Sequence, residues 1–277
     1  MEAMKEKAVI IFSDLDSTLL EHHSYSFEAA RPALDLIKKA GVPLIFCTSK
    51  TRLETEYWQE KLDIHHPFVV ENGGAIYLPA GYFPFPLAQA KNRGRWFVIE
   101  LGSPYAKLRQ FLVSCQQQLD FRLRGFGDMS VEEITVLTGL SPTKAALARE
   151  REYDEPFICD DEKTLSIMKE RAKKIGFKIL GGSRFYHLTG ENDKGKAVRI
   201  LKELYSRLYG NIMTIALGDS HNDLAMLAAV DKAYLVQRHD GSYDRRVQLK
   251  GLVYVDGPGP EGWGQAILSF FAAAKQI

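Results

Sequence analysis

Short apolar runs alternate with longer stretches of helical period along most of this chain. Most of the runs have apolar residues at consecutive positions, which is typical of strands buried on both faces of a parallel sheet. They cover residues 8–12, 42–47, 67–70, 212–217, 233–236 and 252–255. The segment between the first two has apolar residues at helical spacing and ends at Gly41, a typical helix stop. The alternation predicts an α/β fold with an open, Rossmann-like, doubly wound parallel sheet.

The middle of the chain has a different pattern. It follows a Pro-rich stretch and contains two short predicted helices, the second capped by Ser141 ahead of Pro142. Longer helical stretches and further apolar runs, at 96–101, 157–159, 177–180 and 185–188, complete the segment. It has the size of a small domain. We therefore expect a discontinuous core, residues 1–88 and 190–277, with an α+β insert at 89–189.

Composition narrows the class of protein. Of 277 residues, 45% are hydrophobic and 26% are charged, which argues against disorder, collagen or a coiled coil. The 36 Lys and Arg against 35 Asp and Glu give a net charge of +1, so we expect no nucleic-acid or membrane partner. No apolar stretch has the length of a membrane span, and no signal peptide is evident, so we expect a cytoplasmic protein. The cysteines, Cys47, Cys115 and Cys159, fit reduced thiols better than disulfides or a zinc site.

Two acidic side chains follow the first predicted strand. Residues i and i+2 of a strand face the same way, so Asp14 and Asp16 bring two carboxylates side by side. Such a pair needs a cation, and all-oxygen ligands without nearby His or Cys favour Mg²⁺ over zinc. A helix cap and turn is the alternative that this segment alone leaves open.

Three further polar clusters flank predicted elements. The hydroxyls and lysine after the strand at 42–47 suit either a phosphate or ordinary helix capping. Lys194 stands at the start of a helix, where a positive charge is unfavourable because it opposes the helix dipole. A lysine at this position therefore indicates a role other than stabilising the helix. The third cluster follows the strand at 212–217. The first cluster contains Thr48, Ser49 and Lys50, the second contains Lys194, and the third contains Asp219, Asn222 and Asp223.

These clusters supply the groups that phosphoryl transfer needs. Open α/β sheets bind ligands at the carboxyl ends of their strands, where most of these residues stand. Together they offer a carboxylate nucleophile, a second carboxylate that can pass a proton, a hydroxyl and a lysine for phosphate oxygens, and a third acidic group for Mg²⁺.

This set of residues, in this order, resembles the haloacid dehalogenase superfamily of phosphohydrolases. The similar motifs are Asp14-Leu-Asp16-Ser-Thr18, Thr48, Lys194 and Gly218-Asp219-Ser-His-Asn222-Asp223. The resemblance implies that Asp14 is the nucleophile and that Asp16 is first the general acid and then the base. It implies that Thr48 and Lys194 hold phosphoryl oxygens. Mg²⁺ would bind the side chains of Asp14 and Asp219 and the backbone carbonyl of Asp16, with Asn222 and Asp223 behind them. Ser17 departs from the family, which usually has Gly there.

Further segments resemble the mannosyl-3-phosphoglycerate phosphatases, a family within that superfamily with an inserted cap. These segments begin at Cys47, Glu71, Gly182, Asp193 and Gly259. The resemblance implies release of phosphate from mannosyl-3-phosphoglycerate to give mannosylglycerate, a compatible solute. A substrate with a phosphate, a carboxylate and a sugar needs cations and hydrogen-bonding partners. We expect these from Ser49, Lys50, Glu71, Asn72, Ser183 and Arg184.

Several of these expectations keep an alternative. Arg184 is the first choice for the substrate carboxylate, the alternative being a solvated arginine. Glu71 and Asn72 either bind sugar hydroxyls, face the cap, or form a Gly-rich turn. Arg151 is expected on a solvated face.

Other functions also fit the residues. Glucosyl-3-phosphoglycerate, sucrose phosphate or another sugar phosphate would need the same chemistry, as would a phosphomannomutase. A phosphosugar-binding protein would use the same aspartate without rapid turnover, and Asp16 argues against it because a general acid is needed for release. A dimerisation module would leave the charged clusters unexplained. The sequence does not indicate an oligomeric state.

Overall fold

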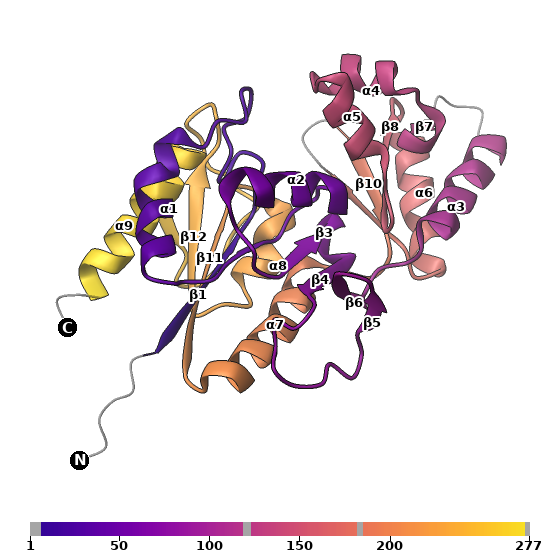
Figure 1. Ribbon diagram of the computed structural model, residues 1–277. Coiled ribbons are helices and arrows are strands. Elements are labelled where there is room, and N and C mark those ends of the chain that lie inside the picture. The colour runs from indigo at the N-terminus through magenta and orange to yellow at the C-terminus, as the bar shows by residue number, and fades with distance from the viewer. Residues whose placement is uncertain (1–6, 119–122, 182–184, 275–277) are drawn as a thin grey trace.

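A parallel sheet of five strands forms the centre of the computed structural model, which describes residues 7–118, 123–181 and 185–274 (Figure 1). The strand order is β13-β12-β11-β1-β2, and every neighbouring pair is parallel. This order confirms the expected doubly wound α/β fold, since the chain winds outward from β1 in both directions. The strands are β1 (Ala8–Ser13), β2 (Leu44–Phe46), β11 (Ile212–Gly218), β12 (Lys232–Gln237) and β13 (Val253–Pro258).

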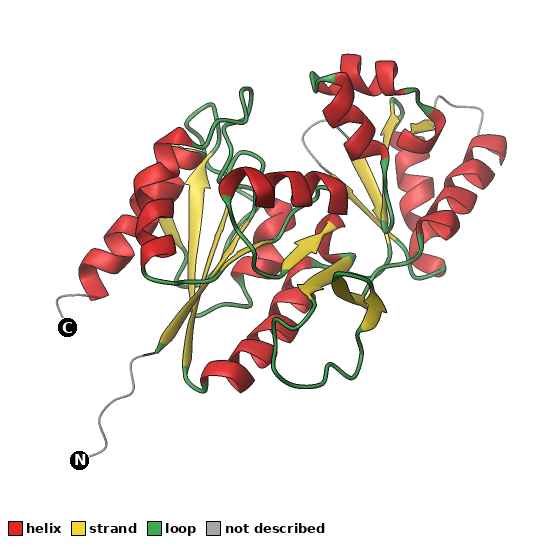
Figure 2. Ribbon diagram, viewed as in Figure 1, coloured by secondary structure: helices red, strands yellow, loops and turns green. Residues whose placement is uncertain are grey.

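Helices cover both faces of this sheet (Figure 2). Ile11 faces a cluster that includes Ile37 and Trp263, whereas its neighbours Ile10 and Phe12 face the opposite cluster. Because both faces are covered there, successive residues of β1 and β2 are apolar, as the sequence pattern predicted. One cluster contains residues of α1 (Arg31–Lys39), α2 (Arg52–Leu62) and α9 (Pro260–Ala274), and the other contains residues of α7 (Lys194–Tyr209) and α8 (Leu224–Leu227).

The apolar run at 67–70 lies parallel to the end of β2, as expected, but its ladder partner places it in a second, antiparallel sheet. A parallel bridge joins Cys47 to Val69, and the N–H of Thr48 donates to the carbonyl of Val69 at 3.1 Å. The reason for the antiparallel pairing is the sharp turn that follows the run, where residues 71–73 all have positive φ and reverse the chain. The sheet has the order β3-β4-β6-β5, with β3 (Phe68–Val70), β4 (Ala75–Pro79), β5 (Lys91–Arg93) and β6 (Trp96–Glu100).

A third sheet lies in the middle of the sequence and is antiparallel throughout. One face packs on α3 and α6, and the other faces the cluster formed with α4 and α5. The Ser141 hydroxyl caps α5, as predicted. The elements are α3 (Tyr105–Gln118), β7 (Leu123–Gly125), α4 (Val131–Thr138), α5 (Pro142–Arg149), β8 (Asp154–Cys159), α6 (Glu162–Lys174), β9 (Lys178–Gly181) and β10 (Tyr186–Thr189).

The chain enters and leaves this segment beside the turn at 71–74. The N–H groups of Leu101 and Gly102 donate to the carbonyl of Gly74, at 2.9 and 2.8 Å. On the return crossing, the Asn192 side-chain amide donates to the carbonyls of Glu71 and Asn72, at 3.4 and 3.2 Å. Both crossings are therefore anchored to one turn of the flanking segment. Strands β5 and β6 precede the first crossing and pair with β4, although they lie inside the range expected for the insert.

No helix within the described ranges is long and apolar enough to cross a membrane. All three cysteines are described and none forms a disulfide, as expected; Cys47 and Cys115 are buried.

Candidate active site

Three adjacent parallel strands end where the predicted acidic and hydroxyl residues begin. Asp14 follows β1, Thr48 follows β2 by two residues, and Asp219 follows β11. The backbone N–H of Asp14 still donates to the carbonyl of Leu217, at 3.0 Å, and this bond holds Asp14 beside the end of β11. The sheet edge thus brings together residues up to 205 positions apart, from 14 to 219.

Lys194 lies between two of these carboxylates. Its Nζ donates to Asp14 Oδ1 at 2.8 Å and to Asp223 Oδ1 at 2.7 Å, and all three side chains are almost completely buried. Lys194 is the first residue of α7, whose N-terminus is capped by Asp193. The two carboxylates raise the pKa of Lys194 although burial opposes this, so the ammonium stays charged. They are the reason for a lysine at this helix start.

Asp14, Asp219 and Asp223 offer carboxylate oxygens within 4.8 Å of one another. Burial raises the pKa of Asp14 well above its usual range and that of Asp219 to about 7, and the nearby Asp223 adds to both shifts. Asp223 is fully engaged, because Oδ1 accepts from Lys194 while Oδ2 accepts from the N–H groups of Asp219 and Ser220. Asp14 and Asp219 are therefore the carboxylates that remain for a cation.

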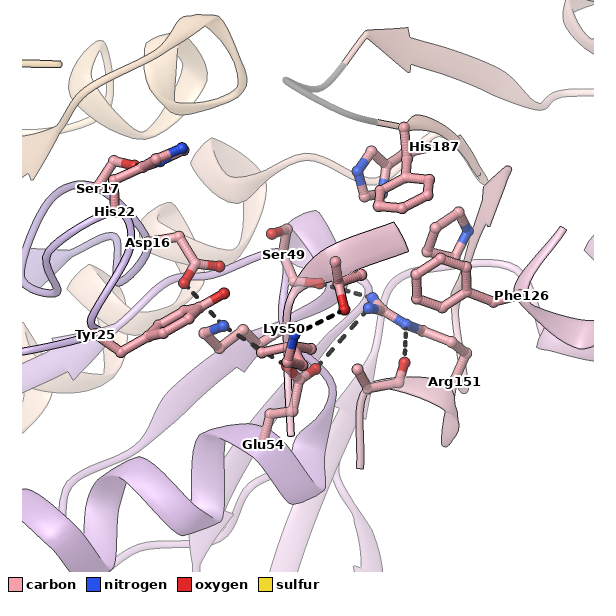
Figure 3. Close-up of a pocket in the computed structure, with 15 residues that line it drawn as sticks. Asp16, Ser17, His22, Tyr25, Ser49, Lys50, Glu54, Phe126, Arg151 and His187 are labelled. Atoms are coloured by element: carbon pink, nitrogen blue, oxygen red, sulfur yellow. Dashed lines mark hydrogen bonds and ion pairs between the residues drawn. The ribbon is translucent and has the colours of Figure 1, made fainter. Parts of the chain in front are cut away.

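Asp16 lies at the mouth of the site and faces Lys50 (Figure 3). Lys50 Nζ is 2.8 Å from Asp16 Oδ1 and 3.6 Å from Glu54 Oε1, and its side chain is 6% exposed. The ammonium also lies 5.1 Å from the centre of the Tyr25 ring. The two carboxylates raise the pKa of Lys50, so a permanent positive charge stands beside Asp16.

The segment between β2 and α2 lies at the same edge. Thr51 is the residue that caps α2, and its side chain accepts from the N–H of Glu54. The capping alternative for Thr48 and Ser49 is therefore wrong. Thr48 is buried and its Oγ1 accepts from the Lys50 N–H at 3.1 Å. Ser49 lines the cavity.

Glu71 and Asn72 connect the sheet edge to the inserted segment. The Glu71 carboxylate has no exposure and accepts from the N–H groups of Glu152 and Tyr153, at 2.7–3.1 Å. Burial raises its pKa to about 8. Of the alternatives left open, Glu71 faces the insert, and it is not among the residues that line the cavities described next. Asn72 lines the cavity, and its amide donates to Asp154 Oδ2 at 3.0 Å.

Two adjoining cavities lie between the sheet edge and the insert, and both are lined by Asp16, Ser49 and His187. The larger has a volume of about 470 Å³ and also reaches Asp14, Asp219 and Asn222. Asn222 donates to Asn72 Oδ1 at 3.4 Å. The smaller cavity has Lys50 and Arg151 in its wall. Ser183 and Arg184, expected to bind substrate, lie outside the described residues.

Among the residues that line these two cavities, Arg151 and His187 were not expected as site residues. The Arg151 side chain is only 7% exposed, which corrects the expected solvated face; it donates to the carbonyls of Ser49 and Ala148, at 2.8 and 2.7 Å (Figure 3). His187 lies above Ser49, and its Nδ1 is 2.8 Å from Asp154 Oδ2. The partners of Arg151 include a residue 102 positions away, so no local pattern reveals its burial. For His187, alternation with Phe185 was the available signal.

Ser17 adopts the left-handed conformation, with a φ of 59°. Glycine adopts this conformation without a steric cost, which gives a physical reason for the family's usual residue at this position. The Ser17 hydroxyl lies 2.8 Å from Nδ1 of His22.

Comparison with known families and proteins gives consistent results. A family model described as haloacid dehalogenase-like hydrolase matches residues 11–83. A glucosyl-3-phosphoglycerate/mannosyl-3-phosphoglycerate phosphatase of Methanococcoides burtonii is 45% identical over 97% of this chain and 99% of its own. A mannosyl-3-phosphoglycerate phosphatase of Pyrococcus horikoshii is 41% identical over 82% of this chain and 90% of its own.

Solved structures share the fold. A Thermoplasma acidophilum protein superposes with a TM-score of 0.69 at 19% identity, over 96% of this chain and 99% of its own. A sucrose-phosphatase from Synechocystis, solved with sucrose and phosphate, superposes with a TM-score of 0.61 at 14% identity. The superposition covers 96% of this chain and 99% of the sucrose-phosphatase. Both superpositions cover the insert as well as the central sheet, so the two proteins share the whole fold. With the relatives above, they lead to one assignment: the chain belongs to the haloacid dehalogenase-like hydrolases, in the family of the glucosyl-3-phosphoglycerate and mannosyl-3-phosphoglycerate phosphatases.

Proposed function

We propose that this protein removes phosphate from mannosyl-3-phosphoglycerate to give mannosylglycerate, through a phosphoryl group carried on Asp14. The observation that carries the proposal is the buried contact of 2.8 Å between Lys194 and Asp14, beside a cavity that also contains Asp16. Lys194 opposes the effect of burial on the Asp14 pKa and so favours the ionised nucleophile, and it fixes one Asp14 oxygen so that the other can attack phosphorus. The 45% identity to a phosphatase named for these substrates supports the choice of substrate.

Asp16 is proposed as the proton carrier. It lies two residues after Asp14, and its side chain is 39% exposed at the cavity mouth, where a leaving oxygen can reach it. It would first protonate that oxygen and then take a proton from the water that attacks the phosphorylated Asp14. Lys50 holds Asp16 in position, whereas Thr48 and Lys194 are proposed to contact the phosphoryl oxygens.

The acidic residues fit a bound Mg²⁺. All the candidate ligands are oxygens, and two buried carboxylates with raised pKa values, Asp14 and Asp219, stand close together. We propose that their side chains and the Asp16 carbonyl hold the ion, with Asn222 and Asp223 behind them. When bound, Mg²⁺ would neutralise negative charge on the phosphoryl group.

The substrate's carboxylate and sugar would extend toward the insert, for which we propose a role as a substrate-specificity cap. Lys50 and Arg151 line the cavity wall there and supply positive charge, and Ser49 and Asn72 supply polar contacts. We propose that residues 190–277 and the N-terminal segment form the core. The pairing of β5 and β6 with β4 favours a first boundary near Gly102 over one at 88.

A substrate panel tests this proposal. We expect kcat/KM with Mg²⁺ to be at least tenfold higher for mannosyl-3-phosphoglycerate than for sucrose phosphate or a hexose monophosphate, because those lack the carboxylate. Glucosyl-3-phosphoglycerate is the second candidate, since the Methanococcoides relative is named for both substrates. A preference for a hexose phosphate would overturn the substrate but not the chemistry. Binding without turnover would favour a phosphosugar-binding protein.

Removing a proposed metal ligand should change the Mg²⁺ requirement. We expect Asp219→Asn to raise the Mg²⁺ concentration for half-maximal activity at least tenfold, because a neutral amide attracts the ion less. Asp160→Asn changes an exposed residue of the insert and serves as the matched control. An unchanged Mg²⁺ dependence in Asp219→Asn would contradict the ligand assignment.

A further inference from the structure

Three histidines gather at the mouth of the larger cavity. His22 and His23 belong to the loop after β1, and His239 belongs to the loop after β12. The centre of the His22 ring lies 4.7 Å from that of His23 and 4.3 Å from that of His239. One nitrogen of each ring lies within 4.8 Å of the others. Two loops separated by more than 200 residues thus bring three imidazoles together.

The histidine cluster adjoins the proposed reaction site. His22 and His239 line the same cavity as Asp14, Asp16 and Asp219. His22 stands next to Ser17 and beside Asp16 at the edge of the pocket (Figure 3). Anything bound by the cluster therefore stands at the entrance that a substrate must pass.

Ser17 gives the cluster part of its geometry. Its hydroxyl lies 2.8 Å from His22 Nδ1 and so fixes the orientation of that ring. A glycine at position 17 could not make this contact.

The ligand chemistry differs from that of the aspartates. Imidazole nitrogens favour Zn²⁺, Ni²⁺, Co²⁺ or Cu²⁺ over Mg²⁺. Nitrogens around a tetrahedral zinc ion lie about 3.3 Å apart, as follows from Zn–N distances of about 2.0–2.1 Å. The His22 and His239 rings are stacked, with an angle of 10° between their planes, so His239 must turn out of the stack for both rings to point a nitrogen at one ion. His23 and His239 are exposed, which leaves their rings room to turn. The nearby cations Arg238 and Arg246 are both paired with Asp244 and so repel an ion less.

We propose that His22, His23 and His239 form a second metal site, selective for zinc-like ions, whose occupation narrows the cavity mouth and slows hydrolysis. The ion would join the loop after β1, which carries Asp16 and Ser17, to the loop after β12. The binding part of this proposal is independent of the proposed function, whereas the effect on turnover rests on it.

A binding experiment tests the site directly. Zn²⁺ is titrated into the full-length protein by competition with a chromophoric chelator, with excess Mg²⁺ present to occupy the aspartates. We expect one zinc site in the wild type, at least tenfold weaker binding in His239→Ala, and loss of binding in the variant with both His22→Ala and His239→Ala. His65→Ala, an exposed histidine paired with Asp63 on another loop, should bind like the wild type. Equal zinc affinity in the double variant and the wild type would overturn the proposal.

Three further measurements separate a built site from scattered histidines. Co²⁺ should give the visible absorption of a nitrogen-ligated ion in the wild type and lose it in His239→Ala. Ser17→Gly should weaken zinc binding several-fold although it removes no ligand. Zinc inhibition should disappear in His239→Ala and persist in His65→Ala. Failure of hydrolysis altogether would overturn the proposed function but leave the zinc titration interpretable.

Discussion

Asp14→Asn is expected to lower kcat at least about a thousandfold, because the amide is a poor nucleophile for phosphorus. The fold should persist, since Lys194 keeps its contact of 2.7 Å with Asp223. Steady-state hydrolysis measures the loss, and Asp35→Asn, an exposed carboxylate on α1, is the control for the same substitution. Near wild-type turnover in Asp14→Asn would show that another group attacks the phosphate.

The proposed roles of Asp14 as nucleophile and Asp16 as proton carrier can be tested separately. With p-nitrophenyl phosphate, whose leaving group needs no protonation, Asp16→Asn should still phosphorylate Asp14 but hydrolyse the product slowly. Acid-quenched protein should then carry covalent phosphate, and Asp14→Asn should carry none. Phosphate on Asp14→Asn would exclude this residue as the carrier.

The central sheet and the reaction end of the site could be predicted because each strand carries its own signal. Consecutive apolar residues indicate burial on both faces, and Asp14, Thr48 and Asp219 follow such runs within two residues. Lys194 was predictable from a conflict: a lysine at a helix start is unfavourable, and the carboxylates of Asp14 and Asp223 resolve it.

The contacts between the core segment and the insert were not predictable. For Glu71 the sequence left a sugar contact, a contact with the cap and a turn open, and its carboxylate binds backbone N–H groups of the insert, 81 and 82 positions away. Arg151 looked solvated, yet it is buried against the carbonyl of Ser49. Such contacts depend on how two segments pack, and neither residue has a local periodicity that reports it. The run at 67–70 has the pattern of a parallel strand, but the turn at Glu71–Gly73 decides its partner.

Lys194→Met should lower both stability and activity, because it leaves Asp14 and Asp223 buried without a cation. Breaking a buried ion pair by removing one partner costs about 3–5 kcal/mol of unfolding free energy. Urea unfolding in the absence of Mg²⁺ measures this, with Lys196→Met as the matched control, since Lys196 is exposed on the same helix. Equal unfolding midpoints for the two variants would contradict a structural role for Lys194.

The pH dependence of that loss separates an electrostatic cause from a packing defect. In Lys194→Met, a buried carboxylate can escape its unpaired charge by taking up a proton, so its pKa in the folded state rises further above that in the unfolded state. Between those two pKa values the folded state binds more protons, so the stability of the variant falls as pH rises. The deficit relative to Lys196→Met should therefore be smallest in acid and grow toward neutral pH. Saturating Mg²⁺ should reduce it, because an ion that binds only the folded state stabilises that state. A deficit that is constant across pH and unaffected by Mg²⁺ would instead indicate lost packing around the side chain.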